Sequence, residues 1–193
     1  MLDLKYIKYE MHDDGIAFIN LNNKPVNALS VNIINELDKL IDNLYENKKC
    51  RLLIFRSLQK HFSAGADLKE RKNMSSEETY KFLDKINHVF NKIQNFPTPT
   101  IASINGAALG GGLELALCCD FRIASENAYV GLPETSLGII PGAGGIIRLS
   151  NLIGVSKSKY WIFTAQKFSS ESAHQDGVID FISKDNELLG ITL

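Results

Sequence analysis

The sequence predicts an α/β fold with largely parallel sheets, and two observations support this. Short apolar runs typical of buried strands alternate with longer amphipathic runs at helical spacing, in the order strand, helix, strand, helix, strand. This alternation is typical of chains whose helices connect parallel strands. The chain can also bury a core, because 45% of its 193 residues are hydrophobic and 22% are charged. Its length indicates one domain, or one domain with an appendage.

The first predicted strand covers residues 15–21 and follows the turn signal Asp13-Asp14-Gly15. Ser30 then precedes an amphipathic helix, and a strand of buried character covers residues 51–55. The apolar side chains of this first helix recur at helical spacing, at Ile33, Ile34, Leu37, Leu40, Ile41 and Leu44.

A second helix opens at Ser75-Ser-Glu-Glu78 and ends before Pro97 and Pro99, which lead into a strand at residues 100–104. Its inner side carries Phe82, Ile86, Val89, Phe90 and Ile93. Later segments predict a short helix at 113–117, a strand at 128–130, a turn at 131–135, a helix at 156–164 and a capped helix from Ser169 to Gly177. Residues 186–193 show no completed element.

Composition excludes several classes of protein. The 21 Lys and Arg residues against 22 Asp and Glu give a net charge of -1, which disfavours binding to nucleic acid by counterion release. No apolar run approaches the roughly 18 residues that span a bilayer, so we expect no membrane partner. The odd set Cys50, Cys118 and Cys119 indicates a reduced interior. The four histidines never fall at metal-ligand spacing, so we expect no metal site.

Gly110-Gly-Gly112 comes directly before the helical run at 113–117. A glycine triplet at a helix start lets a ligand approach the backbone closely and presents free N–H groups at the positive end of the helix dipole. This arrangement suits an anion or an oxyanion. A phosphate loop is disfavoured because no Lys-Ser/Thr pair follows, and in Gly142-Ala-Gly144-Gly-Ile-Ile147 an isoleucine replaces the third glycine of a dinucleotide loop.

Two carboxylates follow this triplet. Glu114 lies one helical turn beyond Gly111, and the residues alone leave open a solvated helix face or a buried, perturbed carboxylate. Its apolar flanks favour burial. Glu134 lies in the turn at 131–135, where an ordinary exposed acid is the favoured interpretation if it is taken alone. Two carboxylates beside one oxyanion site would supply an acid and a base for proton transfer next to a carbonyl.

The loop at His61-Phe-Ser-Ala-Gly-Ala-Asp-Leu-Lys-Glu70 is rich in small residues and lies between a strand and a helix. Its backbone at Ala64-Gly65-Ala66 could offer a further N–H group to the same oxygen. A plain connecting turn is the ordinary interpretation of such a loop.

Four segments together carry a family resemblance. They are Phe62-Ser-Ala-Gly-Ala-Asp-Leu-Lys-Glu-Arg71, Ile104-Asn-Gly-Ala-Ala-Leu-Gly-Gly-Gly-Leu-Glu-Leu-Ala-Leu117, Cys119-Asp-Phe-Arg-Ile-Ala-Ser125 and Gly131-Leu-Pro-Glu-Thr-Ser-Leu-Gly-Ile-Ile-Pro-Gly-Ala-Gly-Gly145. This text resembles the enoyl-CoA hydratase/isomerase (crotonase) superfamily over about residues 5–182. It is most similar to the methylglutaconyl-CoA hydratase branch and its enoyl-CoA hydratase domain-containing relatives. The resemblance implies a superhelix of ββα units, similar to that of ClpP.

The resemblance also implies roles. The backbone N–H groups of Ala66 and Gly111 would form an oxyanion hole for the thioester oxygen. Glu114 and Glu134 keep the twenty-position spacing of the family's two catalytic glutamates. Glu114 would deprotonate the water that attacks Cβ, and Glu134 would protonate Cα. The implied enzyme is a hydro-lyase of fatty-acid or branched-chain amino-acid catabolism.

Further expectations follow from the same resemblance. Ala64, Ala66, Asp67, Leu68 and Lys69 would line the CoA site. Coenzyme A is then part of the substrate, and no cofactor is expected. A homotrimer or a hexamer is the family's assembly. The mitochondrial matrix is the family's usual location, although the N-terminal residues show no import signal, and the cytoplasm is the alternative.

Residues 1–182 are thus expected to form a crotonase-like core, and residues 183–193 are expected to be an unplaced tail. In the superfamily, C-terminal helices cover the acyl pocket, and this sequence is expected to lack most of them. This leaves two alternatives open, a catalytically silent truncated paralogue and an enoyl-CoA isomerase. Binding of AU-rich RNA, associated with the closest branch, is not expected here. That activity needs a row of lysines on the first helix. The predicted first helix here has a single lysine, Lys39, and three acids, Glu36, Asp38 and Asp42.

Overall fold

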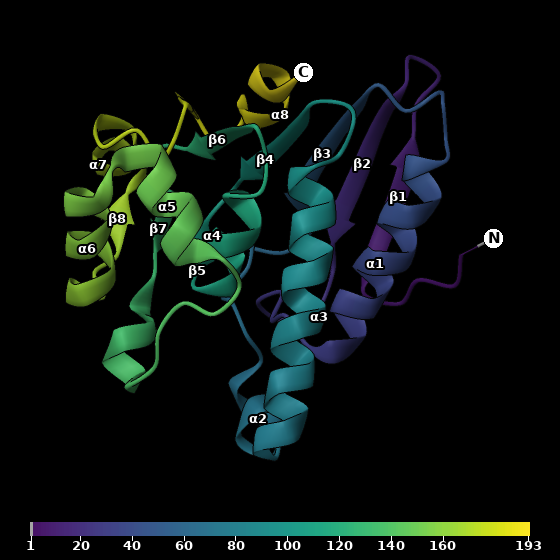
Figure 1. Ribbon diagram of the computed structural model, residues 1–193. Coiled ribbons are helices and arrows are strands. Elements are labelled where there is room, and N and C mark those ends of the chain that lie inside the picture. Colours follow the sequence, from purple (N-terminus) through teal and green to yellow (C-terminus); the bar gives the residue numbers. More distant parts are fainter. Residues whose placement is uncertain (1) are drawn as a thin grey trace.

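A computed structural model describes residues 2–193, and it contains two sheets (Figure 1). The larger has the strand order β1-β2-β3-β4-β6-β9, and all its neighbours are parallel except β1 and β2. Its strands are β1 Ile7–Met11, β2 Ile16–Leu21, β3 Leu52–Ser57, β4 Thr100–Ile104, β6 Phe121–Ser125 and β9 Phe181–Ser183. The predicted α/β class with a largely parallel sheet is confirmed.

The smaller sheet has the order β5-β7-β8 and runs beside the region where the helices of the second half gather. Its strands are β5 Ala107–Leu109, β7 Tyr129–Gly131 and β8 Phe168–Ser169. The pair β5 and β7 is parallel, with Leu109 opposite Gly131. The residues that follow β5 and β7 therefore lie at the same edge of the smaller sheet, and the candidate active site is formed at this edge.

The two long helices, α1 Val31–Tyr45 and α3 Ser76–Gln94, lie side by side over one face of the larger sheet (Figure 1). Every apolar position predicted for their inner sides is buried. Ser30 caps α1, and Ser75 with Glu78 forms a capping box at the start of α3, which confirms both predicted helix starts. The remaining helices are α2 Leu68–Lys72, α4 Gly111–Ala116, the 3₁₀ helix η1 Pro133–Leu137, α5 Gly145–Ile153, α6 Val155–Thr164, α7 Ser170–Gln175 and α8 Leu188–Thr192.

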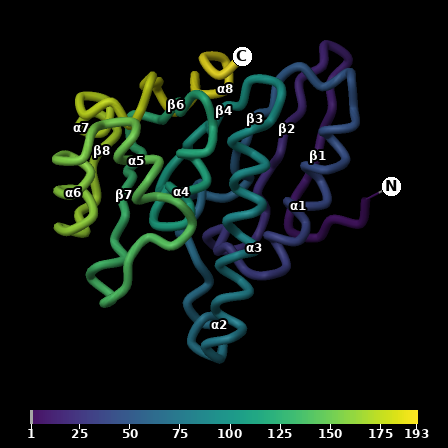
Figure 2. Tube along the Cα trace, viewed as in Figure 1, coloured from purple at the N-terminus to yellow at the C-terminus, as the bar shows by residue number. Residues whose placement is uncertain are grey.

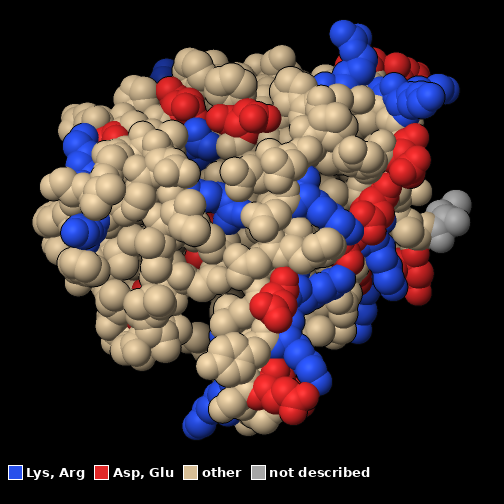
Figure 3. Space-filling model, in the orientation of Figure 1, with Lys and Arg blue, Asp and Glu red and all other residues tan. Residues whose placement is uncertain are grey.

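Charged side chains of both signs alternate on the α1 and α3 side of the molecule, and few lie over α5 and α6 (Figure 3). Lys92 of α3 binds Asp38 and Asp42 of α1 at 2.7 and 2.5 Å, and Lys85 also pairs with Asp38. These lysines are neutralised by the acids of α1. No helix within residues 2–193 is long and apolar enough to cross a membrane.

The C-terminal residues differ from the expectation. The prediction that residues 186–193 complete no element is wrong, because they contain α8, which packs on β4 and β6 of the larger sheet (Figure 2). Leu188 and Thr192 are one helical turn apart and both are buried. The hydroxyl groups of Thr192 and Ser103 are 3.1 Å apart. Residues 183–193, expected to be an unplaced tail, therefore have defined positions.

Further differences concern the other elements. The sequence-based prediction identifies none of β5, β6, β8, β9, α2 and α5. Strand β1 is not among the predicted ones, although its residues alternate strictly between apolar and charged; only Ile7 of the five is fully buried. The predicted turn at 131–135 is largely the 3₁₀ helix η1, which starts at Pro133 and ends at Leu137; Gly138, in the left-handed conformation, follows it. The short helix predicted at 113–117 already begins at Gly111.

Candidate active site

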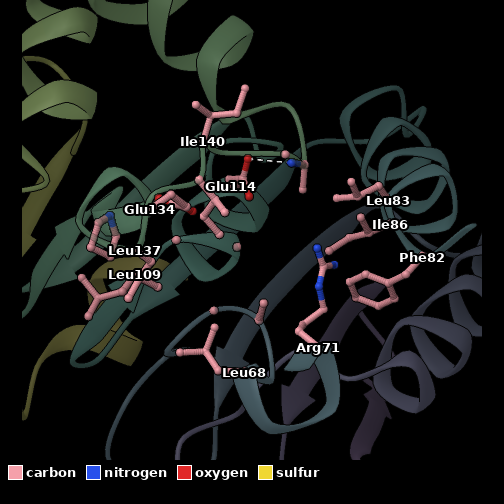
Figure 4. A pocket seen from close by; sticks show the side chains of 18 of the residues that line it. Leu68, Arg71, Phe82, Leu83, Ile86, Leu109, Glu114, Glu134, Leu137 and Ile140 are labelled. Atoms are coloured by element: carbon pink, nitrogen blue, oxygen red, sulfur yellow. Dashed lines mark hydrogen bonds between the residues drawn. The ribbon is translucent and has the colours of Figure 1, made fainter. Parts of the chain in front are cut away.

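A cavity of about 580 Å³ opens between the edge of the smaller sheet and helix α3 (Figure 4). One wall comes from the loop at 64–66 and from the start of α4. The other walls come from α2, α3, η1 and the segment 139–143. Most of the side chains around the cavity are apolar, and the charged ones are Arg71, Glu114 and Glu134. A concave, mainly apolar site with a few convergent charged groups is typical of a small-molecule site.

Backbone pairing brings Ala66 beside Gly111. Ser63 forms a parallel bridge with Ala108 of β5, and its N–H donates to Ala107 O at 3.0 Å. Gly65 adopts φ +90°, and a Cβ there would lie 2.6 Å from Leu109 O and 3.1 Å from Gly111 N. A glycine is required at this close approach. Within residues 2–193, neither the Ala66 nor the Gly111 N–H donates a hydrogen bond, so both are available to one acceptor at the cavity wall.

The glycine triplet is needed because other groups approach its backbone closely. A Cβ at Gly110 would lie 2.9 Å from Glu134 Oε1, and one at Gly112 would lie 2.4 Å from Ser63 O. Gly110 precedes α4 with φ +52°. Gly111 N, the first N–H group of α4, lies beside the loop at 64–66, since a Cβ at Gly65 would be 3.1 Å from it. A free N–H group at a helix start suits an oxyanion.

Glu114 is buried, with 3% of its surface exposed. Its Oε1 accepts hydrogen bonds from Ala143 N and Gly145 N, both at 2.8 Å. Burial raises the pKa of this carboxyl, while the two N–H donors and Arg148 act in the opposite direction. Of the two interpretations that the sequence leaves open, the buried and perturbed carboxylate is confirmed.

Arg148 fixes the loop that binds Glu114. Its guanidinium is buried and donates to Ala143 O at 2.6 Å, to Gln94 Oε1 at 2.7 Å and to Asn91 Oδ1 at 2.8 Å. These bonds tie segment 143–145 to α3. Arg148 is not among the residues predicted from the sequence, although a charged residue between the apolar residues of an amphipathic helix is a signal for such a buried partner.

Glu134 reaches the same cavity from η1. The parallel pairing of Leu109 with Gly131 carries η1 next to Gly110, and Thr135 Oγ1 anchors η1 by donating to Ile162 O at 2.7 Å. Burial, followed by the negative charge of Glu114, raises the pKa of Glu134 to about 7. Its Oε2 is buried and has no hydrogen-bond partner within residues 2–193. The interpretation of Glu134 as an exposed loop acid is therefore wrong.

The residues predicted to bind CoA differ in their positions. Ala64, Ala66 and Leu68 line the cavity, whereas Asp67 and Lys69 do not. Asp67 caps α2 instead, because its Oδ1 accepts from the N–H groups of Lys69 and Glu70 at 3.0 and 3.1 Å. Lys69 is exposed to solvent.

Other residues of the cavity wall are absent from the sequence-based predictions. Phe82 and Ile86 of α3 are predicted only as core residues, yet they also face the cavity. Leu137 and Ile140 lie on the opposite side of the cavity (Figure 4), and Ile139 also lines it. No sequence signal distinguishes them, because an apolar residue in a loop reveals its neighbours only after the chain is folded. Within residues 2–193 there is no group of three or more His, Cys, Asp or Glu side chains that could hold a metal ion.

Comparisons with known proteins agree on one family. The family model described as enoyl-CoA hydratase/isomerase matches residues 11–193. The expectation that the resemblance ends near residue 182 is therefore wrong. Human mitochondrial methylglutaconyl-CoA hydratase is 46% identical over 187 residues, which are 96% of this chain and 55% of the human protein. A probable mitochondrial enoyl-CoA hydratase 2 of Arabidopsis thaliana is 46% identical over 171 residues, which are 87% of this chain and 56% of that protein.

Solved structures give the same result. The crystal structure of an enoyl-CoA hydratase from Bacillus anthracis superposes with a TM-score of 0.94 at 38% identity, covering 97% of this chain and 74% of that one. A structure of Pseudomonas aeruginosa DspI gives a TM-score of 0.93 at 31% identity, covering 99% of this chain and 73% of that one. The chain spans little more than half the length of the human and Arabidopsis relatives.

Proposed function

The chain belongs to the enoyl-CoA hydratase/isomerase family, and from this premise we propose that it adds water across the double bond of a 2-enoyl-CoA thioester. One observation carries the proposal. Two carboxylates with raised pKa values, Glu114 and Glu134, border the same cavity as the N–H groups of Ala66 and Gly111, which donate no hydrogen bond within the described part of the chain. Such an arrangement combines an acid, a base and an oxyanion site around one carbonyl.

The proposed reaction assigns a role to each group. The thioester oxygen accepts from Ala66 N and Gly111 N, so the negative charge that develops on it during attack is stabilised. Glu114 takes a proton from water as the water oxygen bonds to C3, and Glu134 gives its proton to C2. The product is a 3-hydroxyacyl-CoA. Glu114 is then protonated and Glu134 ionised, and proton exchange with solvent restores both.

The loop at 64–68, of which Ala64, Ala66 and Leu68 line the cavity, is the proposed CoA contact. Asp67 contributes by capping α2 and thereby fixing this loop. The human and Arabidopsis relatives are named as mitochondrial proteins, which supports a mitochondrial location for this chain within the proposal. The homotrimer and the absence of a cofactor stay predictions.

We expect crotonyl-CoA to be hydrated by the purified protein. The loss of absorbance of the conjugated thioester measures the rate, and chromatography identifies 3-hydroxybutyryl-CoA as the product. Migration of the double bond in a 3-enoyl-CoA, without hydration of crotonyl-CoA, would instead establish the isomerase alternative. A folded protein that binds CoA thioesters and turns over neither substrate would establish the silent paralogue.

The raised pKa of Glu134 predicts a pH dependence. Because Glu134 acts as the acid, it must be protonated, and its pKa of about 7 means that the protonated fraction is lost as pH rises through about 7. We expect kcat/KM for crotonyl-CoA to fall tenfold per pH unit on the alkaline side of about pH 7. A rate that stays constant between pH 6 and pH 9 would contradict the assignment of Glu134 as the acid.

A further inference from the structure

The two N–H groups that bind Glu114 are held in different ways. Gly145 is the first residue of α5, and the carbonyl of the same peptide, Gly144 O, accepts a helical hydrogen bond at 3.0 Å. Ala143 lies instead in the segment 139–144, which contains no helix or strand. The backbone of α5 therefore holds the first donor, whereas the orientation of the Ala143 N–H depends on the side chains that contact the segment.

Asn87 of α3 holds the peptide that carries the Ala143 N–H. Its Nδ2 donates to Gly142 O at 2.8 Å, and Gly142 O is the carbonyl of this same peptide. The other end of the peptide donates from Ala143 N to Glu114 Oε1, also at 2.8 Å. Two hydrogen bonds thus connect the side chain of α3, through one planar peptide, to the carboxylate. Hydrogen bonds in such a chain polarise and strengthen one another.

The contact between α3 and this peptide is close. A Cβ at Gly142 would lie 2.9 Å from Leu83 Cδ2, so the backbone packs directly against the helix. Leu83 and Asn87 are one helical turn apart and share a face. The Nδ2 group of Asn87 also donates to Leu83 O at 2.8 Å. Both of its N–H groups are therefore used, and the amide is fixed in one orientation.

We propose that Asn87 is a positioning residue for the hydration, because by binding Gly142 O it directs the Ala143 N–H toward Glu114 and keeps this carboxylate where it can deprotonate water. The inference rests on the proposed function, which gives Glu114 the role of the base. Asn87 does not line the cavity, so it acts through the peptide and not by contact with the substrate. Arg148 holds the next peptide through Ala143 O at 2.6 Å, so the segment should stay folded when Asn87 is replaced.

Replacement of Asn87 by Ala is expected to lower kcat for crotonyl-CoA hydration about tenfold with KM nearly unchanged. A misplaced base slows the reacting step and leaves the contacts of the thioester intact. Alanine also favours a helix more than asparagine does, so α3 should not be destabilised. Steady-state kinetics and an unfolding curve measure the two properties.

Asn95→Ala is the matched control. The side-chain amide of Asn95 likewise donates to the carbonyl four residues earlier, Asn91 O, at 2.8 Å, but within residues 2–193 it donates to no atom of the segment 139–144. This variant should keep the wild-type kcat. Wild-type kcat in Asn87→Ala, or an equal loss in the two variants, would overturn the inference.

A double variant shows whether Asn87 acts through Glu114. In Glu114→Gln the base is absent, so Asn87→Ala in that protein should lower the remaining rate by less than about twofold. If the two residues act independently, their effects multiply. A further loss of about tenfold in the double variant would therefore show that Asn87 acts on something other than the base, and this would overturn the inference.

Hydrogen exchange measured by NMR makes the test independent of hydration. We expect the Ala143 N–H to exchange about tenfold faster in Asn87→Ala than in the wild type, while the Gly145 N–H keeps its rate because α5 holds it. If the Ala143 rate rises but the wild type does not hydrate crotonyl-CoA, the proposed function fails and the Asn87 contact stands. If the Ala143 rates are equal in the two proteins, the inference about Asn87 fails, whatever the rate of hydration.

Discussion

Replacement of Glu114 by Gln is expected to lower kcat for crotonyl-CoA hydration by about 10³-fold with little change in KM. An amide cannot take the proton from water, which is the role proposed for Glu114. The amide oxygen can still accept from Ala143 N and Gly145 N, so the loop at 143–145 should keep its position. The measurement is steady-state kinetics by thioester absorbance, together with an unfolding curve for each protein.

Glu126→Gln serves as the control for this change, because Glu126 is exposed and its side chain forms no hydrogen bond within residues 2–193. It should keep wild-type kinetics. A Glu114→Gln protein that retains more than a tenth of the wild-type kcat would show that another group activates the water. The role of Glu114 would then be structural only.

Replacement of Gly65 by Ala is expected to damage both stability and catalysis. At φ +90° a side chain is strained, and its Cβ would also lie 2.6 Å from Leu109 O. The loop must move away from the end of β5, which separates Ala66 N from Gly111 N. We expect a loss of about 2–4 kcal/mol in the free energy of unfolding and about a 10²-fold fall in kcat from the damaged oxyanion hole. Urea unfolding and crotonyl-CoA kinetics measure the two effects.

Gly138→Ala separates backbone strain from crowding. Gly138 also has a positive φ, +72°, but no atom lies within 4 Å of the position that its Cβ would take. Only the strain of the left-handed conformation remains, about 1–2 kcal/mol. If Gly65→Ala is no more destabilising than Gly138→Ala and hydrates crotonyl-CoA normally, the close contact of this loop with β5 is not what positions the two N–H groups.

The layout of the fold can be predicted from the sequence where one face of an element is continuously buried. The inner sides of α1 and α3 have this property, and their apolar spacing and serine caps identify them correctly. Elements at the edges of the fold have no continuously buried face. Strand β1 buries only Ile7 fully, and α8 contacts the sheet through two residues, Leu188 and Thr192. In β1 the strict alternation of apolar and charged residues is a local signal that the prediction did not use, whereas the position of α8 depends on the sheet against which it packs.

In the candidate site, too, local sequence features predict some residues, and the others are recognised only in the folded chain. The glycine triplet and the apolar flanks of Glu114 predict a buried carboxylate beside free N–H groups, because both features are local. Glu134 looks like a loop acid in the sequence, since its burial comes from the pairing of β5 with β7 and from Glu114 across the cavity. Arg71 and Arg148 depend on contacts with α3 that only the folded chain provides.

The central claim is that Glu114 and Glu134, acting beside one oxyanion site, hydrate an enoyl thioester. Its most direct test is the rate of absorbance loss when crotonyl-CoA is mixed with the wild-type protein and, in parallel, with Glu134→Gln. We predict clear turnover in the wild type and a loss of about 10³-fold in the variant, because the amide has no proton to give to C2 at a useful rate. Equal rates in the two proteins, or no hydration by a folded wild type, would contradict the claim.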